Sequence, residues 1–571
     1  MQIIKSLFKV FLVLAPSAAI AQSTYMQRGT NDEHFVDRVE IKQQTNTDLN
    51  FSTLKPFNRK HAVQELEFLD SARFGYNDHL ANDRFRGWTD LDLSEKDEYN
   101  MAHFLMNNSE WVQGKKEGFE SLKSLGVFYR TKANMYEVTT PDFFMAINPM
   151  LQLNYSYEKD NDETVFLNSK GASVRGNIAG KVGFAAMILD NQERGPKFFE
   201  QMVAETRAVP GVGYHQVFKQ TAHDYFDARG YITFNAAKFI DFQAGFDKNF
   251  IGNGYRSLFL SDFGNSYLFV KINTRIWKLN YQNLFMELYP QFVKNSDEIL
   301  DRKYAAMHHL SMNVTKWLNI GLFESVVFGR KNHFDFSYLN PLIFYRHIEG
   351  NNGSPDNALL GFDAKANVGH VAQVYGQFLL DEFQLTKVKN DPKNWVNKFG
   401  IQAGIKYMDA LNVDNLDFQF EFNRVRPFTY SRDSVSNYTS YNQPLAHPLG
   451  ANFNEFIFIA KYQPANKWFI DLRAFYSQKG LDSTGQNWGG NIFRSYADRT
   501  LETGFSVAGG GHKNTVMNGI LNVSYEVRPN LFLDLGGQYR NSKIENVPGE
   551  KNTIMGTIGV RLNMAKRLYD Y

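Results

Sequence analysis

His309 and Ser311 form the pair of side chains in this sequence that most resembles part of an enzyme. Residues two apart on a strand share one face, and a histidine beside a serine can act as the base for a nucleophile. Apolar side chains recur at alternate positions from Tyr304 to Met312, so the pair falls on the opposite, polar face. No third residue that would orient the histidine is evident. We therefore interpret the pair as an ordinary polar cluster and keep a lipid esterase as a weak alternative.

Charged residues in otherwise apolar surroundings form a second group. Paired carboxylates can cleave glycosidic bonds when about 5–10 Å separates them. We favour a network of ion pairs in the lumen of a barrel that ties loops to the barrel wall, because charges that are removed from water need partners. The residues expected in this polar network are Glu324, Arg346, Glu349, Asp381 and Glu382.

Aromatic residues followed by amides or cations form a third group, in segments that lack strand periodicity. Stacking rings with hydrogen-bonding partners are what a sugar site needs. One of these segments is a glycine turn, Gly252-Asn253-Gly254, and no strand-turn-helix context for a phosphate loop surrounds it. The candidate glycan contacts are Tyr255, Arg256, Tyr430, Tyr438, Tyr441 and Trp488.

The sequence gives no indication of a metal site, a disulfide bond or nucleic-acid binding. The 571 residues include no cysteine, which removes disulfides, thiolate ligands and a cysteine nucleophile. His308 and His309 point to opposite faces of a strand, and the other histidines are scattered. A net charge of +2 gives no electrostatic argument for nucleic acid. We predict no metal, no cofactor and no nucleic-acid partner.

The element that must position these residues is a strand of about ten residues with one apolar and one polar face. Leu531 to Arg540 shows this alternation, and Ile554 to Asn563 repeats it. Such strands behind a secretory signal are typical of a transmembrane β-barrel, whose apolar face turns to lipid. The predicted fold class is therefore all-β: an outer-membrane barrel of about 16–18 antiparallel strands with a small helical subdomain and inward-folded loops.

Short and long connections alternate along the chain, which is the asymmetry of outer-membrane barrels. Long connections, including 330–362 and 427–454, are expected outside the cell. Leu318 to Phe328 is apolar on both parities, which predicts loops or a plug inside the lumen; residues 192–226, with a helical run from Phe198 to Glu205, are a candidate insert. The expected tight turns are 179–181, 237–238, 275–277, 315–316, 367–370, 411–415, 464–467 and 528–530.

The first 125 residues precede the predicted barrel. Lys5, Lys9, an apolar stretch and small residues before Gln22 indicate a cleaved secretory signal. Ser94, with Asp97 three residues on as its capping partner, predicts the start of a helix. The expected domains are a signal peptide (1–21), a leader or first strand (22–56, the strand running from His34 to Lys42), a periplasmic helical subdomain (57–125) and the outer-membrane β-barrel (126–571).

Several segments, in order, resemble a known family. They are GFDKNFIGNGYRSLFLSD (245–262), KWLNIGLFE (316–324), YLNPLIFYR (338–346), GSPDN (353–357) and DEF (381–383). They are similar to the Wzi-like capsule-assembly proteins of the outer membrane, including the RemB-like gliding-motility branch of the Bacteroidetes. The family often has Trp-Gly-Pro-Gly where this chain has Ile251 to Gly254, so a sugar-binding role of that tryptophan is not expected here. The resemblance implies a closed, occluded barrel with a periplasmic helical element and no enzymatic activity.

The predicted function is that of a non-enzymatic barrel in a Gram-negative outer membrane, which anchors or assembles surface polysaccharide or supports gliding. The alternatives are a general or sugar-selective porin, which needs an open lumen, and, more weakly, a barrel lipid esterase. Expected partners are outer-membrane lipid, surface or capsular polysaccharide, the barrel assembly machinery, and gliding or secretion components. The last strand, Ile554 to Met564, with Tyr569 and Tyr571 beyond it, is expected to carry the assembly signal.

Overall fold

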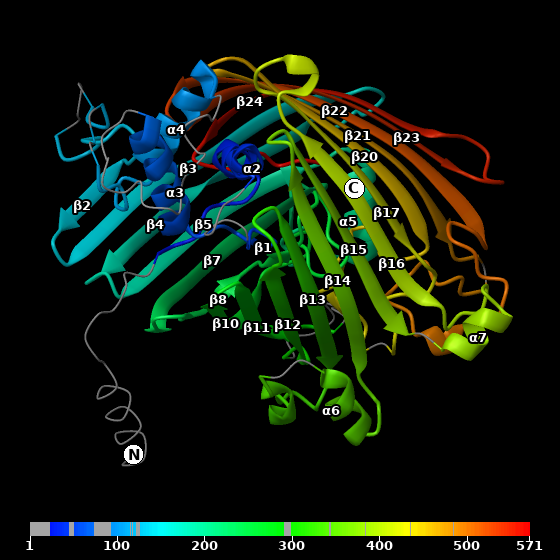
Figure 1. Ribbon diagram of the computed structural model, residues 1–571. Helices are drawn as coiled ribbons and strands as arrows, with labels where there is room; N and C mark the ends of the chain where they lie inside the picture. The colour runs from blue at the N-terminus through cyan, green and yellow to red at the C-terminus, as the bar shows by residue number, and fades with distance from the viewer. Residues whose placement is uncertain are drawn as a thin grey trace.

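An antiparallel β-barrel dominates the computed structural model (Figure 1). The structure describes residues 23–44, 51–73, 93–114, 116, 118–121, 126–290, 299–341, 344–382, 384–433, 435–483 and 485–571, so the predicted signal peptide lies outside the described residues. The barrel closes with 18 strands, the upper end of the predicted range. They are β3 (Phe143–Glu158), β4 (Val165–Ile178), β5 (Val182–Arg194), β7 (Ala222–Ala237), β8 (Ile240–Asp247), β10 (Tyr267–Ile276), β11 (Leu279–Leu288), β12 (Lys303–Asn313), β13 (Leu318–Phe328), β14 (Asn357–Val368), β15 (Ala372–Glu382), β16 (Lys398–Tyr407), β17 (Leu416–Val425), β20 (Phe453–Ala465), β21 (Trp468–Leu481), β22 (His512–Arg528), β23 (Leu531–Ile544) and β24 (Lys551–Leu562).

Each barrel strand pairs with its neighbours in sequence, and the pairing of β24 with β3 closes the ring. The register places Leu562 opposite Leu151, and β2 (Tyr136–Thr140) pairs with the part of β3 that β24 does not reach. A second short strand, β6 (Gln216–Phe218), adds to β7. Within the described residues the 18 barrel strands form a closed ring, and a membrane-spanning sheet requires such closure because its edge strands would otherwise be unpaired.

The alternation of apolar and polar residues sorts the two faces of the wall as predicted. Leu535 and Ile558 are 59% and 60% exposed on the outer face, whereas Asp534 and Gln538 are buried inside. All eight predicted tight turns join neighbouring strands at one end of the barrel, and Trp277 lies exposed there. Short turns mark the periplasmic end, so the long loops at the opposite end face the cell exterior.

Three helices close the periplasmic end and are named here the periplasmic plug. They lie together at the upper left of Figure 1 and pack around one apolar core that includes Phe104. The capping box predicted at Ser94 and Asp97 is present. The helices are α2 (Asn31–Gln43), α3 (Arg59–Arg73) and α4 (Glu95–Asn107).

The predicted strand from His34 to Lys42 is wrong, because this segment lies within helix α2. Thr30 caps the helix by accepting a hydrogen bond from the Glu33 amide. Both faces of the helix are buried, one against the plug core and the other, with Arg38, against charged residues of the barrel turns. Polar residues on a buried face hide the helical period from a hydrophobicity pattern.

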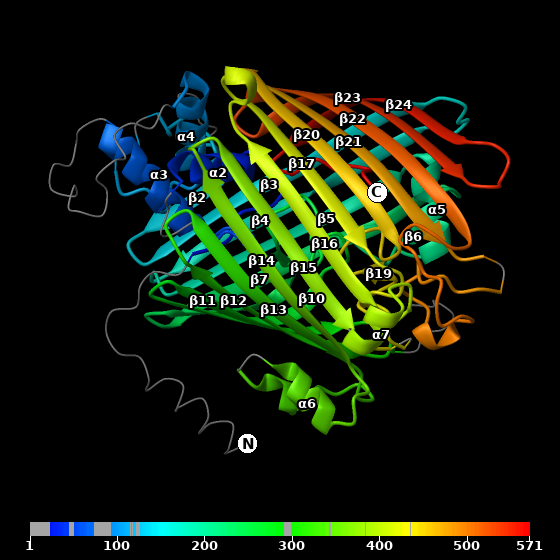
Figure 2. The same ribbon diagram turned by 45° about the vertical axis from the view of Figure 1, so that its right-hand side comes forward.

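The long loops fold both into the lumen and around the wall. The segment between β8 and β10 runs inward, and its strand β9 (Phe250–Ile251) pairs with β1 (Leu54–Lys55) of the amino-terminal segment. Helices α5, α6 and α7 lie at the barrel end away from the plug (Figure 2). The remaining loop elements are α5 (Lys197–Thr206), η1 (Phe336–Leu339), α6 (Tyr345–Asn351), α7 (Leu385–Asn390), η2 (Ala410–Asn412), β18 (Thr439–Ser440), β19 (Gln443–Pro444) and η3 (Tyr496–Asp498).

Leu318–Phe328 is apolar on both faces, as the sequence indicates, and the structure gives a reason for each face. On the inner face, Phe323 stacks on Phe259 of the inward loop, with ring centroids 4.5 Å apart. On the outer face, Phe328 packs against Tyr338 of the loop that carries η1 and α6. The prediction of an apolar lumen filling is confirmed, and an outward-folded loop adds a second buried surface.

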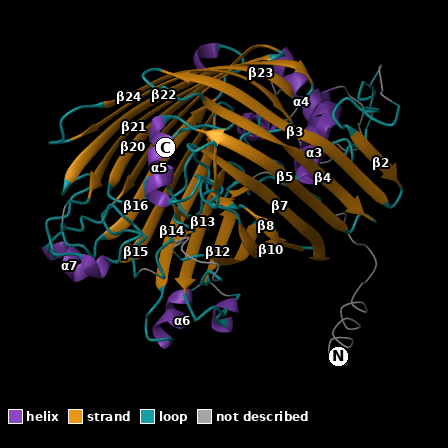
Figure 3. Cartoon of the chain, turned by 180° about the vertical axis from the view of Figure 1, so that it is seen from behind, coloured by secondary structure: helices purple, strands orange, loops and turns teal. Residues whose placement is uncertain are grey.

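The segment after β24, residues 564–571, turns into the lumen rather than ending at the membrane interface. In Figures 1 to 3 the C-terminus lies within the outline of the barrel, near α5. Tyr569 packs against Phe199 of α5, and its hydroxyl bonds to Glu193. Among the described residues, no helix is long and apolar enough to cross a membrane.

Candidate functional site

The outer loops bring together five aromatic residues, named here the outer aromatic cluster: Trp395, Phe428, Trp488, Tyr496 and Phe505. The rings of Trp395 and Tyr496 stack with centroids 4.9 Å apart, and the Arg499 guanidinium lies 3.9 Å from the Trp395 ring. The indole N–H groups of Trp395 and Trp488 donate to Glu502 and Ser483. Trp488 and Tyr496 are half-buried, and the Tyr496 hydroxyl has no hydrogen-bond partner within the described part of the chain.

This cluster combines three loops that are far apart in the sequence. Trp395 follows α7, Phe428 follows β17, and the other three lie between β21 and β22. The two rings stack on each other and have cations close by, so the half-buried edge of Tyr496 and its hydroxyl are the groups that can contact a sugar. Of the predicted glycan contacts, Trp488 belongs to this cluster.

The three candidate tyrosines of the 427–454 loop fill the outer half of the lumen instead of forming an exposed surface. Tyr430 and Tyr438 are each 1% exposed and stack with centroids 5.5 Å apart. Their hydroxyls donate to the backbone carbonyls of Leu258 and Phe259 in the inward loop. Tyr441 is also buried, against Tyr289. In this arrangement the rings stabilise an apolar filling and present no face to a ligand.

The other two candidate glycan contacts, Tyr255 and Arg256, lie on the inward loop and bind the segment after β24. The Tyr255 hydroxyl and the Arg256 Nη1 both donate to the Asp570 carboxylate, the latter over 3.2 Å. Arg473 of β21 donates to the Tyr255 hydroxyl over 2.8 Å. We name Tyr255, Arg256 and Arg473 the carboxylate cradle. Glu421 fixes the turn by accepting from the Tyr255 and Arg256 amides.

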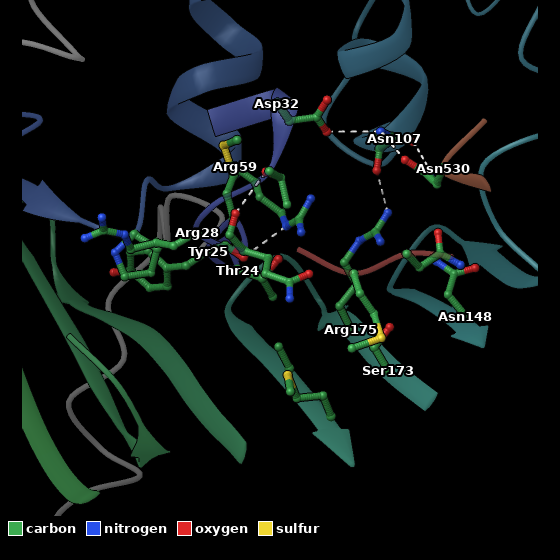
Figure 4. A pocket seen from close by; sticks show the side chains of 18 of the residues that line it. Thr24, Tyr25, Arg28, Asp32, Arg59, Asn107, Asn148, Ser173, Arg175 and Asn530 are labelled. Carbon is green, nitrogen blue, oxygen red and sulfur yellow. Dashed lines mark hydrogen bonds between the residues drawn. The ribbon is translucent and has the colours of Figure 1, made fainter. Parts of the chain in front are cut away.

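Two adjacent cavities lie between the periplasmic plug, the inward loop and the wall. The plug cavity, of about 280 Å³, is shown in Figure 4: Asn107 there donates to Asp32 and Asn530, and Arg175 donates to the Asn107 carbonyl. The tail cavity, of about 350 Å³, is lined by the cradle and by residues after β24. Nine lysine and arginine side chains line the tail cavity against five aspartate and glutamate side chains, and three of the cations pair with Asp471, Asp534 and Glu193 just outside the lining. Arg28 and Lys248 line both.

The chain matches the family model described as capsule assembly protein Wzi over residues 117–554. The chain belongs to the Wzi capsule assembly family. Among solved structures it is similar to Wzi of Escherichia coli, with 12% identity over 96% of this chain and 100% of that chain and a TM-score of 0.54, which shows the shared fold. That protein is described as an outer membrane protein involved in group 1 capsule assembly and a carbohydrate-binding β-barrel.

Further similar structures include OprD, described as an outer membrane protein, and OccAB2. Pseudomonas aeruginosa OprD shares 11% identity over 73% of this chain and 95% of that chain, with a TM-score of 0.41. Acinetobacter baumannii OccAB2 shares 9% identity over 73% and 97%, with a TM-score of 0.42. No curated protein matches this sequence.

The polar network predicted inside the fold divides between two places. Asp381 does lie inside, where it accepts from the Tyr430 amide and, with Glu382, lies near Lys398. The other three residues lie on the outer wall beneath or within the outward-folded loop: Glu324 accepts from the amides at the start of α6, and Arg346 pairs with Glu349. The prediction for Glu324, Arg346 and Glu349 is therefore corrected, because Glu324 has the same strand parity as the outward Leu322.

The pair His309 and Ser311 lies in the lumen wall with a partner that the sequence did not reveal. His309 Nε2 lies 2.7 Å from Asp363 Oδ2 on β14. Gly321 permits this contact, since a Cβ at its position would lie 2.3 Å from the same carboxylate oxygen. Both side chains of the pair are buried, and within the described residues no hydrogen bond joins them. The cluster is therefore a buried hydrogen-bonded pair of His309 and Asp363 in the wall rather than an accessible nucleophile.

Trp395 and Asp570 are the residues of interest that the sequence reasoning missed. A tryptophan just before a strand, at Asn394 to Val396, is a weak signal for an interface residue, and only the folded loops show its stacking on Tyr496. The contact of Asp570 with Arg256 joins residues 314 positions apart, for which the sequence carries no local pattern. Among the described residues, no group of three or more histidine, aspartate or glutamate side chains is placed to hold a metal ion.

Proposed function

We propose that this protein is a non-enzymatic outer-membrane factor that anchors or assembles surface polysaccharide through its outer loops. Membership of the Wzi capsule assembly family supports the proposal, as does the carbohydrate binding described for Escherichia coli Wzi. Rigid scaffolds commonly present binding residues on loops, and here the loops stand on a closed barrel.

The outer aromatic cluster is the observation that carries the choice of surface. Trp488 and Tyr496 are half-buried at the loop end, fixed by stacking and by indole hydrogen bonds. Side chains that are already fixed can contact a sugar through their edges and hydroxyls without loss of side-chain entropy on binding. The cations Arg432 and Arg499 around Tyr496 would add attraction for an acidic polysaccharide.

A porin is disfavoured because chain segments fill the lumen at both ends. The periplasmic plug closes one end, and the inward loop packed on Tyr430 and Tyr438 closes the other. Conductance of the purified protein in a planar bilayer separates the two functions. We expect no stable open channel. Steady conductance of the size expected for a porin would instead favour the porin function.

The decisive experiment removes the gene from its own host and scores two phenotypes. Capsule shed into the medium is the result expected for polysaccharide anchoring. Lost spreading on agar with capsule intact would instead favour the gliding role and overturn the anchoring one. Altered uptake of small solutes, with capsule and spreading intact, would favour the porin.

A pair of purified variants tests whether the outer aromatic cluster is the surface that binds polysaccharide. Tyr496→Ala should reduce binding of the purified protein to capsular polysaccharide about three- to tenfold, the range of a lost aromatic contact. Phe128→Ala, an exposed ring before β2 at the periplasmic end, is the matched control. Equal binding by both variants and the parent would exclude the outer aromatic cluster as the contact.

Further parts of the proposal concern export and assembly. We propose that residues 1–21 are a cleaved signal, that the host is one of the Bacteroidetes, and that the barrel assembly machinery recognises the last strand. Deleting residues 553–571 should then remove the protein from the outer membrane. Normal outer-membrane amounts of that variant would show that the signal lies elsewhere.

A further inference from the structure

The segment after β24 is held inside the lumen by contacts along its length. Arg567 bonds twice to Glu193 of β5, and Tyr569 bonds to the same carboxylate. The Tyr571 ring lies against Phe263 of the inward loop, with centroids 5.5 Å apart. We name residues 564–571 the luminal tail. It crosses the tail cavity as a bound peptide would.

The carboxylate cradle shows which chemical group this position accepts. Asp570 presents one carboxylate oxygen to the Tyr255 hydroxyl and to the Arg256 guanidinium, and its backbone carbonyl accepts from Arg256 over 2.5 Å. Arg473 supports the cradle from the wall through the Tyr255 hydroxyl. Charge-assisted bonds of this kind are strong and select a planar oxyanion. The aspartate occupies a site that is built for a carboxylate.

The cavity beside the cradle has both the charge and the space for a further anion. Its lining carries an excess of cations, and among the described residues Lys461 has no hydrogen-bond or ion-pair partner. A volume of about 350 Å³ falls within the range of small-molecule sites. Thr30 and Gln419 in the lining carry polar side chains that can form hydrogen bonds to hydroxyls. A carboxylated mono- or disaccharide fits this combination of size, charge and polarity.

We propose that the tail cavity binds a small carboxylated saccharide whose carboxylate replaces that of Asp570 in the cradle. The luminal tail is then a latch that competes with the ligand for Tyr255 and Arg256. Competition lowers the apparent affinity by the fraction of molecules in which the latch is open, so weakening the latch raises affinity. The inference goes beyond the proposed function, which concerns the outer loops.

Release of the latch can be measured directly because the chain has no cysteine. Tyr571→Cys supplies a single thiol on the luminal tail of the full chain in detergent. Digalacturonate should raise the rate of maleimide labelling several-fold, and maltose or sodium chloride at equal ionic strength should not. Inorganic phosphate as a further probe separates a carboxylate site from a general anion site. An unchanged rate with digalacturonate, or an equal rise with chloride or phosphate, would overturn the proposal.

Two variants test the competition by calorimetry with digalacturonate. Asp570→Asn keeps the shape of the tail but weakens the latch, and it should bind digalacturonate about tenfold more tightly than the parent. Arg256→Gln removes the cradle guanidinium and should abolish binding. Equal affinities of Asp570→Asn and the parent would refute the latch even if Arg256→Gln fails to fold. Capsule retention in cells reports on the outer loops alone, so the two proposals can fail separately.

Discussion

The two ends of the lumen are closed by different physical means. At the periplasmic end, helices with their own apolar core meet the barrel through charges: Arg38 bonds to Asp97, Asp409 and Asp417 over 2.5–3.1 Å. At the outer end, loops without a core of their own interdigitate through apolar side chains, as Phe259 does with Phe323. One closure is a docked unit, whereas the other is part of the barrel's folding core.

This difference predicts how each closure responds to change. A plug that buries most of its apolar residues internally can leave the barrel without exposing them, so polar contacts and the pairing of β1 with β9 decide its position. Burial alone would raise the pKa of Asp97, but the Arg38 guanidinium outweighs burial and holds that pKa at about 2. The outer closure cannot leave without exposing Leu258 and Phe259 to water, which opposes its opening.

Arg38→Ala should have the largest effect and should act on the plug alone. It removes the cation shared by Asp97, Asp409 and Asp417 and leaves Lys42 as the remaining partner of Asp97 and Asp409. Removing one partner of a buried ion pair costs about 3–5 kcal/mol. A nitroxide on Ala102→Cys, an exposed position of α4, should become mobile while the barrel stays folded.

The matched control for this substitution is Arg346→Ala in the outer loop. Arg346 is 64% exposed, so its pair with Glu349 contributes little and the nitroxide should stay immobile. If the nitroxide at position 102 were as immobile in Arg38→Ala as in the parent, the ion pairs of Arg38 would not be what holds the plug.

Leu258→Ala should have the next largest effect, at the outer closure. Leu258 is fully buried in the apolar cluster of the inward loop, and deleting such a side chain costs about 2–5 kcal/mol. The urea midpoint for unfolding from lipid vesicles should fall, and added salt should not change the loss. Val217→Ala, at an exposed position of the short strand β6, is the control. An equal fall in both variants would argue against a folding core at this end.

The contact of His103 with Asp32 and Glu526 sharpens the comparison through pH. Burial lowers the pKa of His103, but the two carboxylates outweigh burial and raise that pKa to about 10. The group binds its proton more tightly in the docked plug, so its contribution is complete below about 6.5 and is lost as the pH rises through about 10. Nitroxide mobility on α4 should rise over that window, and His103→Gln should remove the dependence. The outer closure should show no matching transition.

The barrel could be predicted from the sequence because the residues of each strand alternate according to the lipid and the lumen that they face. The alternation of apolar and polar residues from Leu531 to Arg540 distinguishes the outer face of the strand from the inner face. Ser94 and Asp97 indicate the start of a helix within four residues. Strand parity also indicates the outward position of Glu324, because Glu324 and the lipid-facing Leu322 are two residues apart on the same strand.

The closures could not be predicted in the same way because they depend on distant partners. Helix α2 is buried against the other two plug helices on one side and against charged barrel turns on the other. Its sequence therefore lacks the single apolar face whose period indicates a helix. Tyr430 and Tyr438 look like surface residues of a polar loop until the inward loop covers them. Arg256 looks like a ligand contact, and its partner Asp570 lies beyond the last strand.

Ser94→Ala should have the smallest effect and tests whether the plug is a unit with its own local stability. The Ser94 hydroxyl accepts from the Asp97 amide at the start of α4 and donates to Asn415 on the β16–β17 turn over 2.5 Å. Loss of an N-cap costs about 1 kcal/mol, so α4 should fray and the plug should loosen slightly, seen as a small rise in nitroxide mobility at Ala102→Cys. Ser94→Thr keeps the hydroxyl and should restore the parent value. If Ser94→Thr loosened the plug as much as Ser94→Ala, the packing of the serine rather than its two hydrogen bonds would determine how this helix docks.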